Sequence, residues 1–366
     1  MKLKFLLCLV TITVLIVSPL TAQDDSPVIT AANIRQLQSV AHIDFADLPE
    51  ELGAVQNGWF VVNPQGSQFI VKSRSEHVLG LDHNGTLLAD YVITTADSLP
   101  ATVMDAAFDQ TSKNMLSIHS GGGAFYLAKQ YDDAASPYIY KFNSADIPVR
   151  LWQSDDKSDF LEMMPADSLL KPYILKLPSD PLLELNIQLI EVNTDELETM
   201  LVAPDIDSDA YLRIGRIEPP LAITVTETGL LKRWNLETGE LNATAELGDI
   251  PGMGAVNNDG TSFAWRDGSS TDLHLLDFES GVDSVIASLG GTYLPFLLLS
   301  ANADVIISVN VGDEPNVVAW DVVTGERIEL GEYRVCNRQP DLVRLSHDGS
   351  TLVIGCDTGL DIWRTR

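Results

Sequence analysis

Positive charge and cysteine are scarce in this sequence. It holds 23 Lys and Arg against 52 Asp and Glu, a formal charge of −29, and it has 3 cysteines. Nucleic acids and anionic lipid surfaces bind through clusters of Lys and Arg, so we expect neither as a partner. The acidity favours solubility or a salty habitat over one specific cationic partner.

Motifs of the common catalytic and cofactor sites are also missing. There is no Cys-x-x-Cys, no His-x-x-x-His, no Gly-x-Ser-x-Gly nucleophile elbow and no Walker-type Gly-Lys-Ser/Thr. The usual sequence signals for thiol redox chemistry, helical zinc sites, serine hydrolases and nucleotide binding are therefore absent. Scattered structural or surface roles are expected for the six histidines, His42, His77, His83, His119, His274 and His347.

Residues 1–22 are predicted to be a secretory signal peptide. Lys2 and Lys4 form a basic start, and an apolar run covers residues 5–17. That run is shorter than the roughly 18 to 20 residues that span a bilayer, which favours a cleaved signal over a retained anchor. The mature chain would begin at Gln23, carry a formal charge of −31 and be secreted, periplasmic or otherwise extracellular, without inserting into a membrane.

Two cysteines would remain after processing, Cys336 and Cys356. An even count in an exported protein suggests a bridge. If residues 341–345 and 351–356 pair as a hairpin, the two cysteines come close together at its open end. A disulfide there would restrict the unfolded chain, and the alternative is a pair of small buried thiols.

The C-terminal half contains a weak repeat. Trp234-Asn235-Leu236-Glu237-Thr238-Gly239 recurs as Trp320-Asp321-Val322-Val323-Thr324-Gly325. We call the Trp of this motif the mark, and Leu276 and Trp363 stand in its place between and after these copies. The marks follow one another by 42, 44 and 43 residues. Such a period is typical of four-stranded propeller blades of roughly 40 to 45 residues.

A second series of residues supports the register. Asp259-Gly260, Asn302-Ala303 and Asp348-Gly349 precede the next mark by 17, 18 and 15 residues, and Asn63-Pro64-Gln65-Gly66 precedes Leu81 similarly. Asn, Asp and Gly accept the backbone angles of a tight hairpin. We therefore expect a turn between the first two strands of a blade at each place.

The marks and turns predict an all-β chain with seven blades. Earlier marks are assigned near Leu81, Phe142 and Ile190, and the last blade lacks its outermost strand. Residues 38–45 alternate in polarity and are expected to supply that strand. Residues 31–37, capped by Thr30, are expected to form a short helix leading into it. The predicted organisation is a lead-in segment over 23–37 and one propeller over 38–366.

The Trp-Asp/Asn marks, the Thr-Gly that follows them, the Asp-Gly turns and the N-terminal closing strand together resemble the WD40-repeat β-propeller family. The chain is similar to a divergent, secreted form of it, because the Gly-His dipeptide that opens family repeats is absent. The resemblance implies that the Trp is a packing residue. It also implies that the fold is a platform for partners, so it predicts architecture more than activity.

Three segments resemble ligand sites and fail further checks. The carboxylates of 205–209 begin like a calcium loop, but Ala210 and Arg216 stand where Gly and Glu are required, so a solvated acidic loop is expected. The glycine run of 119–123 is interpreted as the tip of an inserted loop. Residues 319–325 resemble a quinoprotein signature without its later Trp, so no quinone cofactor is expected.

The expected function is that of an exported, monomeric, non-enzymatic propeller that binds a protein or glycan. Its contact surfaces are predicted at residues 119–137 and 203–209. The alternative is a propeller hydrolase or lyase with a site at the central channel. That would require His, Asp or Glu at one inner-strand position of several blades, which is not seen. No catalytic, cofactor-binding or metal-binding residue is assigned.

Overall fold

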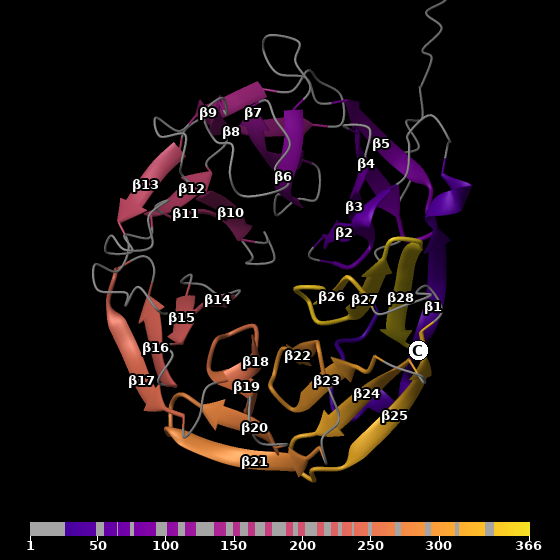
Figure 1. The fold of residues 1–366 in the computed structure, drawn as a ribbon. Helices are drawn as coiled ribbons and strands as arrows, with labels where there is room; N and C mark the ends of the chain where they lie inside the picture. Colours follow the sequence, from indigo (N-terminus) through magenta and orange to yellow (C-terminus); the bar gives the residue numbers. More distant parts are fainter. Residues whose placement is uncertain are drawn as a thin grey trace, which may run out of the picture.

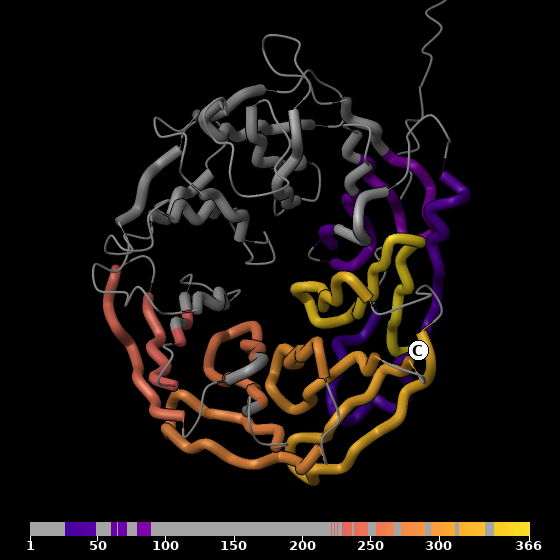
Figure 2. The backbone as a smooth tube through the Cα atoms, in the orientation of Figure 1, coloured from indigo at the N-terminus to yellow at the C-terminus, as the bar shows by residue number. Residues whose placement is uncertain are grey.

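A computed structural model describes residues 26–48, most of 55–92, the strands between 101 and 215, and 221–366 with short gaps. Side chains are described in 26–48, in parts of 60–88 and in most of 221–366. Figure 2 colours the backbone of these parts. Two short 3-10 helices, η1 (Ile34–Gln36) and η2 (Phe45–Asp47), occur in the described residues, and the other regular elements there are β-strands. The expectation of an all-β chain is confirmed.

The described strands form antiparallel sheets of four strands each, taken consecutively along the chain (Figure 1). The first three sheets are β2 (Val55–Val62), β3 (Gln68–Ser73), β4 (His77–Asp82) and β5 (Leu87–Val92); β6 (Ala101–Phe108), β7 (Asn114–Gly121), β8 (Ala135–Asn143) and β9 (Val149–Gln153); β10 (Phe160–Met164), β11 (Tyr173–Leu177), β12 (Gln188–Val192) and β13 (Leu197–Leu201). The next three are β14 (Tyr211–Gly215), β15 (Leu221–Val225), β16 (Leu230–Asn235) and β17 (Leu241–Glu246); β18 (Pro251–Val256), β19 (Ser262–Asp267), β20 (Asp272–Asp277) and β21 (Val282–Ser288); β22 (Leu297–Leu299), β23 (Val305–Val309), β24 (Asn316–Asp321) and β25 (Arg327–Glu332).

The terminal sheet combines both ends of the described chain. It contains β26 (Leu342–Leu345), β27 (Thr351–Cys356) and β28 (Gly359–Thr365), and β1 (Leu37–Asp44) is its outer strand in the order β1-β28-β27-β26. The register runs from Leu37 opposite Thr365 to Asp44 opposite Gly359. The predicted N-terminal strand and the predicted hairpin of the last sheet are both confirmed.

The expected helix over residues 31–37 is wrong. One 3-10 turn, η1, forms instead, and the Asn33 side chain accepts the N–H of Thr30 at 2.8 Å. The segment is held from outside, because Ile29 N–H binds Gly349 O at 2.9 Å and Ala31 N–H binds Asp304 Oδ2 at 2.9 Å. These anchors and the start of β1 at Leu37 leave too few residues for a helical turn to propagate.

The first turn, between strands one and two of a sheet, has the same hydrogen bonds in four sheets. A buried Asn or Ser ends the first strand, and its side-chain oxygen accepts the N–H five residues later: Asn63 from Gln68 (3.0 Å), Asn257 from Ser262 (2.9 Å), Ser300 from Val305 (3.0 Å) and Ser346 from Thr351 (2.9 Å). The residue three positions after this Asn or Ser has a positive φ: Gly66 (68°), Gly260 (61°), Ala303 (59°) and Gly349 (70°). The predicted turns are confirmed, and the acceptor residue explains why each is tight.

The second turn, between strands three and four, is also repeated. Its Asp or Asn directly follows the mark and accepts backbone N–H groups of the next residues: Asp82 from Asn84 (2.8 Å), Asn235 from Thr238 (3.1 Å), Asp277 from Ser280 (2.8 Å) and Asp321 from Thr324 (2.8 Å). A Gly at positive φ then closes the turn at Gly85, Gly239, Gly281 and Gly325. The Asp/Asn and Gly of the sequence repeat are therefore turn residues.

The marks lie near the ends of the third strands and are buried. The exposed fractions are 5% for Trp234, 1% for Leu276, 2% for Trp320 and 2% for Trp363. Trp363 of the terminal sheet packs in one apolar cluster with Val305 and Val317 of the neighbouring sheet. The mark is thus a packing residue between sheets, which also explains why Leu can replace Trp at position 276.

The first turns of different sheets are bonded to one another. Asn257 Nδ2 donates to Ala301 O of the next sheet at 3.4 Å, and Asn258 Nδ2 donates to His347 O of the terminal sheet. Arg364 of the terminal sheet donates to Gly66 O in the first sheet at 2.7 Å. In Figure 1 the first strand of each sheet lies toward the middle and the fourth toward the outside. The first turns therefore share one face near the middle of the molecule.

One further sequence expectation differs from the structure, and others concern residues that the structure does not describe. His119, Ser120 and Gly121 belong to strand β7 rather than to an inserted loop tip, because β7 pairs there with both β6 and β8. The signal peptide, residues 203–209 and Cys336 lie outside the described residues. Among the residues that the structure describes, no helix is long and apolar enough to cross a membrane.

Two glycines at equivalent second-turn positions allow a matched test of contact between sheets. Gly281 and Gly325 have φ of 68° and 69°, but an added Cβ meets nothing within 4 Å at Gly281 and lies 2.7 Å from Ile286 O at Gly325. Gly281→Ala should cost about 1–2 kcal/mol of unfolding free energy from backbone strain alone. Gly325→Ala should cost about 1–3 kcal/mol more, because the neighbouring sheet must move.

Urea unfolding of both variants and the parent chain measures this difference. Equal losses for the two variants would show that the turn at Gly325 does not press on β21.

Candidate functional site

Three structurally equivalent positions recur on the outer part of each sheet. They are the mark, the residue two before it on the third strand, and the fourth-strand residue paired with the mark. In three of the sheets they are Leu276, His274 and Asp283; Trp320, Val318 and Arg327; Trp363, Asp361 and Ser39. The repeat thus brings chemically different side chains to one recurrent place beside a sheet junction.

In sheet β18–β21 this place holds a histidine and a carboxylate. His274 Nδ1 lies 3.0 Å from Asp283 Oδ2, and Trp265 Nε1 donates to Asp283 Oδ1 at 3.1 Å. The His274 ring stacks on Trp265 with 4.2 Å between centroids. Their side chains keep 16% and 29% exposure for His274 and Asp283, so the pair is reachable from solvent. The carboxylate and the indole thus hold the imidazole in one orientation.

In the terminal sheet the equivalent carboxylate is not accessible to solvent. Asp361 is fully buried, accepts the Ser39 hydroxyl at 2.6 Å and accepts Trp363 Nε1 at 3.0 Å. Ser39 belongs to β1 and Asp361 to β28, so the carboxylate joins the two ends of the chain. We assign it a structural role.

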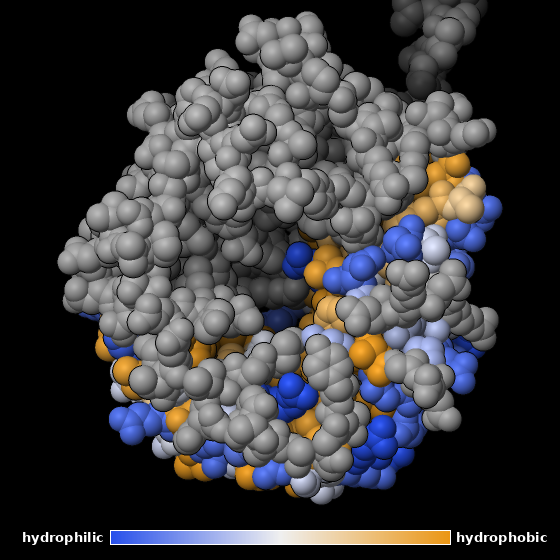
Figure 3. Space-filling model, in the orientation of Figure 1, coloured by the Kyte–Doolittle hydropathy of each residue, from blue (hydrophilic) through white to orange (hydrophobic). Residues whose placement is uncertain are grey.

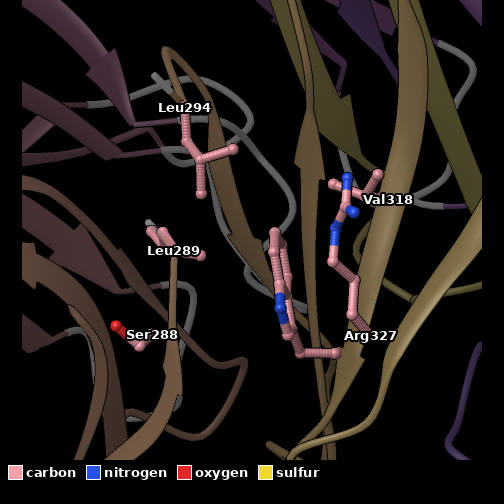
Figure 4. A pocket seen from close by; sticks show the side chains of 6 residues that line it. Ser288, Leu289, Leu294, Val318 and Arg327 are labelled. Atoms are coloured by element: carbon pink, nitrogen blue, oxygen red, sulfur yellow. The ribbon is translucent and has the colours of Figure 1, made fainter. Parts of the chain in front are cut away.

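In sheet β22–β25 the equivalent residues, Trp320, Val318 and Arg327, line a crevice between this sheet and sheet β18–β21. Its volume is about 140 Å³, and Figure 4 shows Leu289 and Leu294 on one side, opposite Val318 and Arg327. The walls are buried apolar side chains, whereas Arg327 stands at the rim with its Nη1 2.8 Å from Glu329 Oε1. A cavity of this size holds a group about as large as benzene.

The terminal sheet also carries two carboxylates with like charge, Asp341 and Asp357. Burial, and then the charge of Asp357, raise the pKa of Asp341. Burial likewise raises the pKa of Tyr333 to about 12, and its hydroxyl donates to Asn310 O at 3.2 Å. A raised carboxyl pKa beside a second carboxyl marks a place where charge is costly.

These groups differ in what they could do chemically. His274 and Asp283 supply two parts of a nucleophilic site, which also requires a hydroxyl or thiol within hydrogen-bond reach of the imidazole. The contacts that the structure gives His274 are to Asp283 and Trp265. No group of three or more His, Cys, Asp or Glu in the described part of the chain is arranged to hold a metal ion.

Sequence reasoning missed the His274–Asp283 pair and Asp341–Asp357. His274 and Asp283 are nine residues apart in the sequence. The register of β20 and β21, with a bulge after Leu273, brings their side chains together. Of the other histidines, His42 lies exposed on β1, His83 lies in the second turn of the first sheet, and His347 is buried in a first turn. Alternating positions on paired strands would have been the signal, once the register was known.

No protein-family model matches this chain, and no curated protein sequence matches it.

Two Asp→Asn variants should move stability in opposite directions. The N–H of Ser280 lowers the pKa of Asp277, so its carboxylate stabilises the fold above the unfolded pKa and that contribution disappears as pH falls through the lower folded pKa. Asp277→Asn should therefore lower the melting temperature at neutral pH. Asp341→Asn should raise it, because the folded state disfavours the charge of Asp341.

Thermal unfolding from pH 7 to pH 3 measures both variants against the parent chain. The difference for Asp277→Asn should shrink below about pH 4, where an ordinary Asp takes up its proton, because the folded pKa of Asp277 is lower still. The difference for Asp341→Asn should shrink as pH falls toward about 4, through the raised pKa of Asp341, and should be gone below that pH. A gain for Asp341→Asn that persists unchanged in acid would contradict a charge effect.

Proposed function

We propose that the chain closes into a seven-bladed propeller of the WD40 type. The support is the set of seven four-stranded sheets in chain order. In the sheets beyond residue 221, a buried mark lies near the end of the third strand. Adjacent sheets contact one another: β2 with β6, β10 with β6, β14 with β18, β22 with β18, β1 with β25, and β27 with β2. The proposed ring also requires sheet β10–β13 to pack on sheet β14–β17.

We further propose that this exported, monomeric propeller is a non-enzymatic scaffold for a protein or glycan. One observation carries the proposal: Asn258 of one first turn donates to His347 O of another, across an intervening sheet. Turns bonded to one another make a rigid face, which lowers the entropy lost when a partner binds. Residues 119–137 and 203–209 are the proposed additional contacts.

A hydrolase or lyase is the alternative, and the observation that favours it is the His274–Asp283 pair, which lies on the third and fourth strands of its sheet and not at the central channel expected from the sequence. In this alternative the imidazole acts as the general base toward a substrate at the sheet junction. The two functions separate experimentally, because a scaffold binds its ligand without turnover and an enzyme loses turnover when the base is removed.

Export is proposed together with a disulfide between Cys336 and Cys356. Cys356 ends β27, is 1% exposed and is disulfide-bonded, and the identity of its partner stays a prediction. After export, the proposed mature chain holds only these two cysteines. An oxidised preparation should then show no thiol to an alkylating reagent before reduction.

A matched pair of substitutions tests the scaffold function. Asn302 is exposed on a first turn, and Asn242 is exposed on the outer strand β17. Ligands of the mature chain are first identified on glycan and peptide arrays. Asn302→Arg should weaken binding about tenfold or more by placing a bulky cation on the proposed face, and Asn242→Arg should leave it unchanged.

The same arrays are assayed for hydrolysis or elimination of the bound ligand. Turnover that is lost in His274→Gln while folding is retained would contradict the scaffold and establish the enzyme.

A further inference from the structure

Exposed aliphatic side chains gather at one place on the outer margin of the molecule. Val282 and Val285 on β21 are 54% and 59% exposed, and Val323 in the second turn of sheet β22–β25 is 86% exposed. The strand and the turn are in contact, because a Cβ added to Gly325 in that turn would lie 2.7 Å from Ile286 O on β21. We call Val282, Val285 and Val323 the valine patch.

The valine patch rests on packed side chains. Ile286 and Val322, which adjoin Val285 and Val323 in the sequence, are partly buried against the apolar cluster that contains Trp320. Figure 3 shows hydrophobic atoms among hydrophilic ones along the lower margin of the molecule, where β21 lies in Figure 1. Single exposed aliphatic side chains are normal on a protein surface, whereas neighbouring ones mark surfaces that contact a partner.

β21 also lacks the charges that commonly protect an outer strand. Within the described residues it pairs with β20 on one side, and its other edge has no strand beside it. Charged side chains usually discourage association at such an edge. The outer strand of the next sheet, β25, carries the exposed ion pair of Arg327 and Glu329. The one charged residue of β21 is Asp283, and His274 holds its carboxylate at 3.0 Å.

The charges around the valine patch decide which partner it fits. Exposed glutamates flank it, because Glu279 lies in the turn before β21 and Glu326 lies in the turn that carries Val323. The whole chain has 52 Asp and Glu against 23 Lys and Arg, so a second copy of the chain or an anionic membrane would be repelled. Lys and Arg on a partner would instead be attracted.

We propose that the valine patch docks a protein partner that presents aliphatic side chains flanked by Lys or Arg. The aliphatic side chains cover the valines, and the basic groups approach Glu279 at the rim. Protein interfaces commonly combine an apolar centre with a polar rim in this way. The inference rests on the proposed scaffold function. It specifies the class of partner and adds a contact surface on the outer margin, apart from the first turns.

Two synthetic peptides of equal charge test the proposal, one alternating Lys with Leu and the other alternating Lys with Ser. Each is titrated into the full mature chain at physiological salt, and binding is followed by fluorescence polarisation. The Lys-Leu peptide should bind at least about tenfold more tightly than the Lys-Ser peptide, because only its side chains cover the valines. Equal binding would show attraction to the acidic chain as a whole and would overturn the proposal.

Two matched double variants locate the binding. Val285→Ser combined with Val323→Ser should weaken binding of the Lys-Leu peptide about tenfold. Val40→Ser combined with Leu241→Ser is the control, because these side chains are 39% and 45% exposed on the outer strands of two other sheets, and binding should be unchanged. All four side chains are exposed, so both variants should fold like the parent chain. Equal losses of affinity would contradict the location.

Other occupants of the patch would give different results. A dimer of the mature chain in sedimentation, dissociated by the Val285→Ser and Val323→Ser double variant, would overturn the proposal in favour of a second copy. Binding to phosphatidylcholine vesicles that the same variant loses would overturn it in favour of lipid. Absence of Lys-Leu binding would also overturn it, and the scaffold function would still stand if a ligand from the arrays loses affinity in Asn302→Arg.

Discussion

The pairing of β1 with β28 is the interaction on which the rest of the structure depends. It joins residues that are more than 300 positions apart in the chain, and the buried Asp361 fastens it by accepting the Ser39 hydroxyl. The segment before β1 buries Ile29, Ile34 and Leu37 in the same apolar cluster as Trp363. Full burial of such side chains stabilises by about 1.5–3 kcal/mol each, which offsets the entropy of ordering the N-terminal segment.

The repeated turns give the sheets their common geometry. One buried Asn or Ser fixes the first turn, and one Asp or Asn fixes the second, in both cases through short bonds to nearby backbone N–H groups. Because these bonds are local, each sheet can form its hairpins without its neighbours. Contacts between sheets, such as Trp363 with Val305 and Arg364 with Gly66, then align the sheets. The candidate site and the crevice both lie at such junctions.

The fold was predictable where the physical cause is local, and the site was not. Asp348-Gly349 indicates a turn by itself, and the alternation of residues 38–45 indicates an edge strand. The helix over 31–37 failed because Gly349 O and Asp304 hold this segment from other parts of the chain. His274 and Asp283 meet only in one register, with a bulge between Leu273 and His274. Ser26, His83 and Arg364 line one groove between the terminal and first sheets, although no spacing rule in the sequence expresses their proximity.

Hydrogen exchange of the mature chain, followed by mass spectrometry, tests the pairing of the chain ends most directly. If β1 and β28 form one ladder, the amides of 37–44 that face β28 should exchange slowly and should lose protection together with those of 359–365 as urea is raised. Rapid exchange of 37–44, while 359–365 and 351–356 stay protected, would contradict the account. The N-terminal strand would then not be part of the terminal sheet in solution.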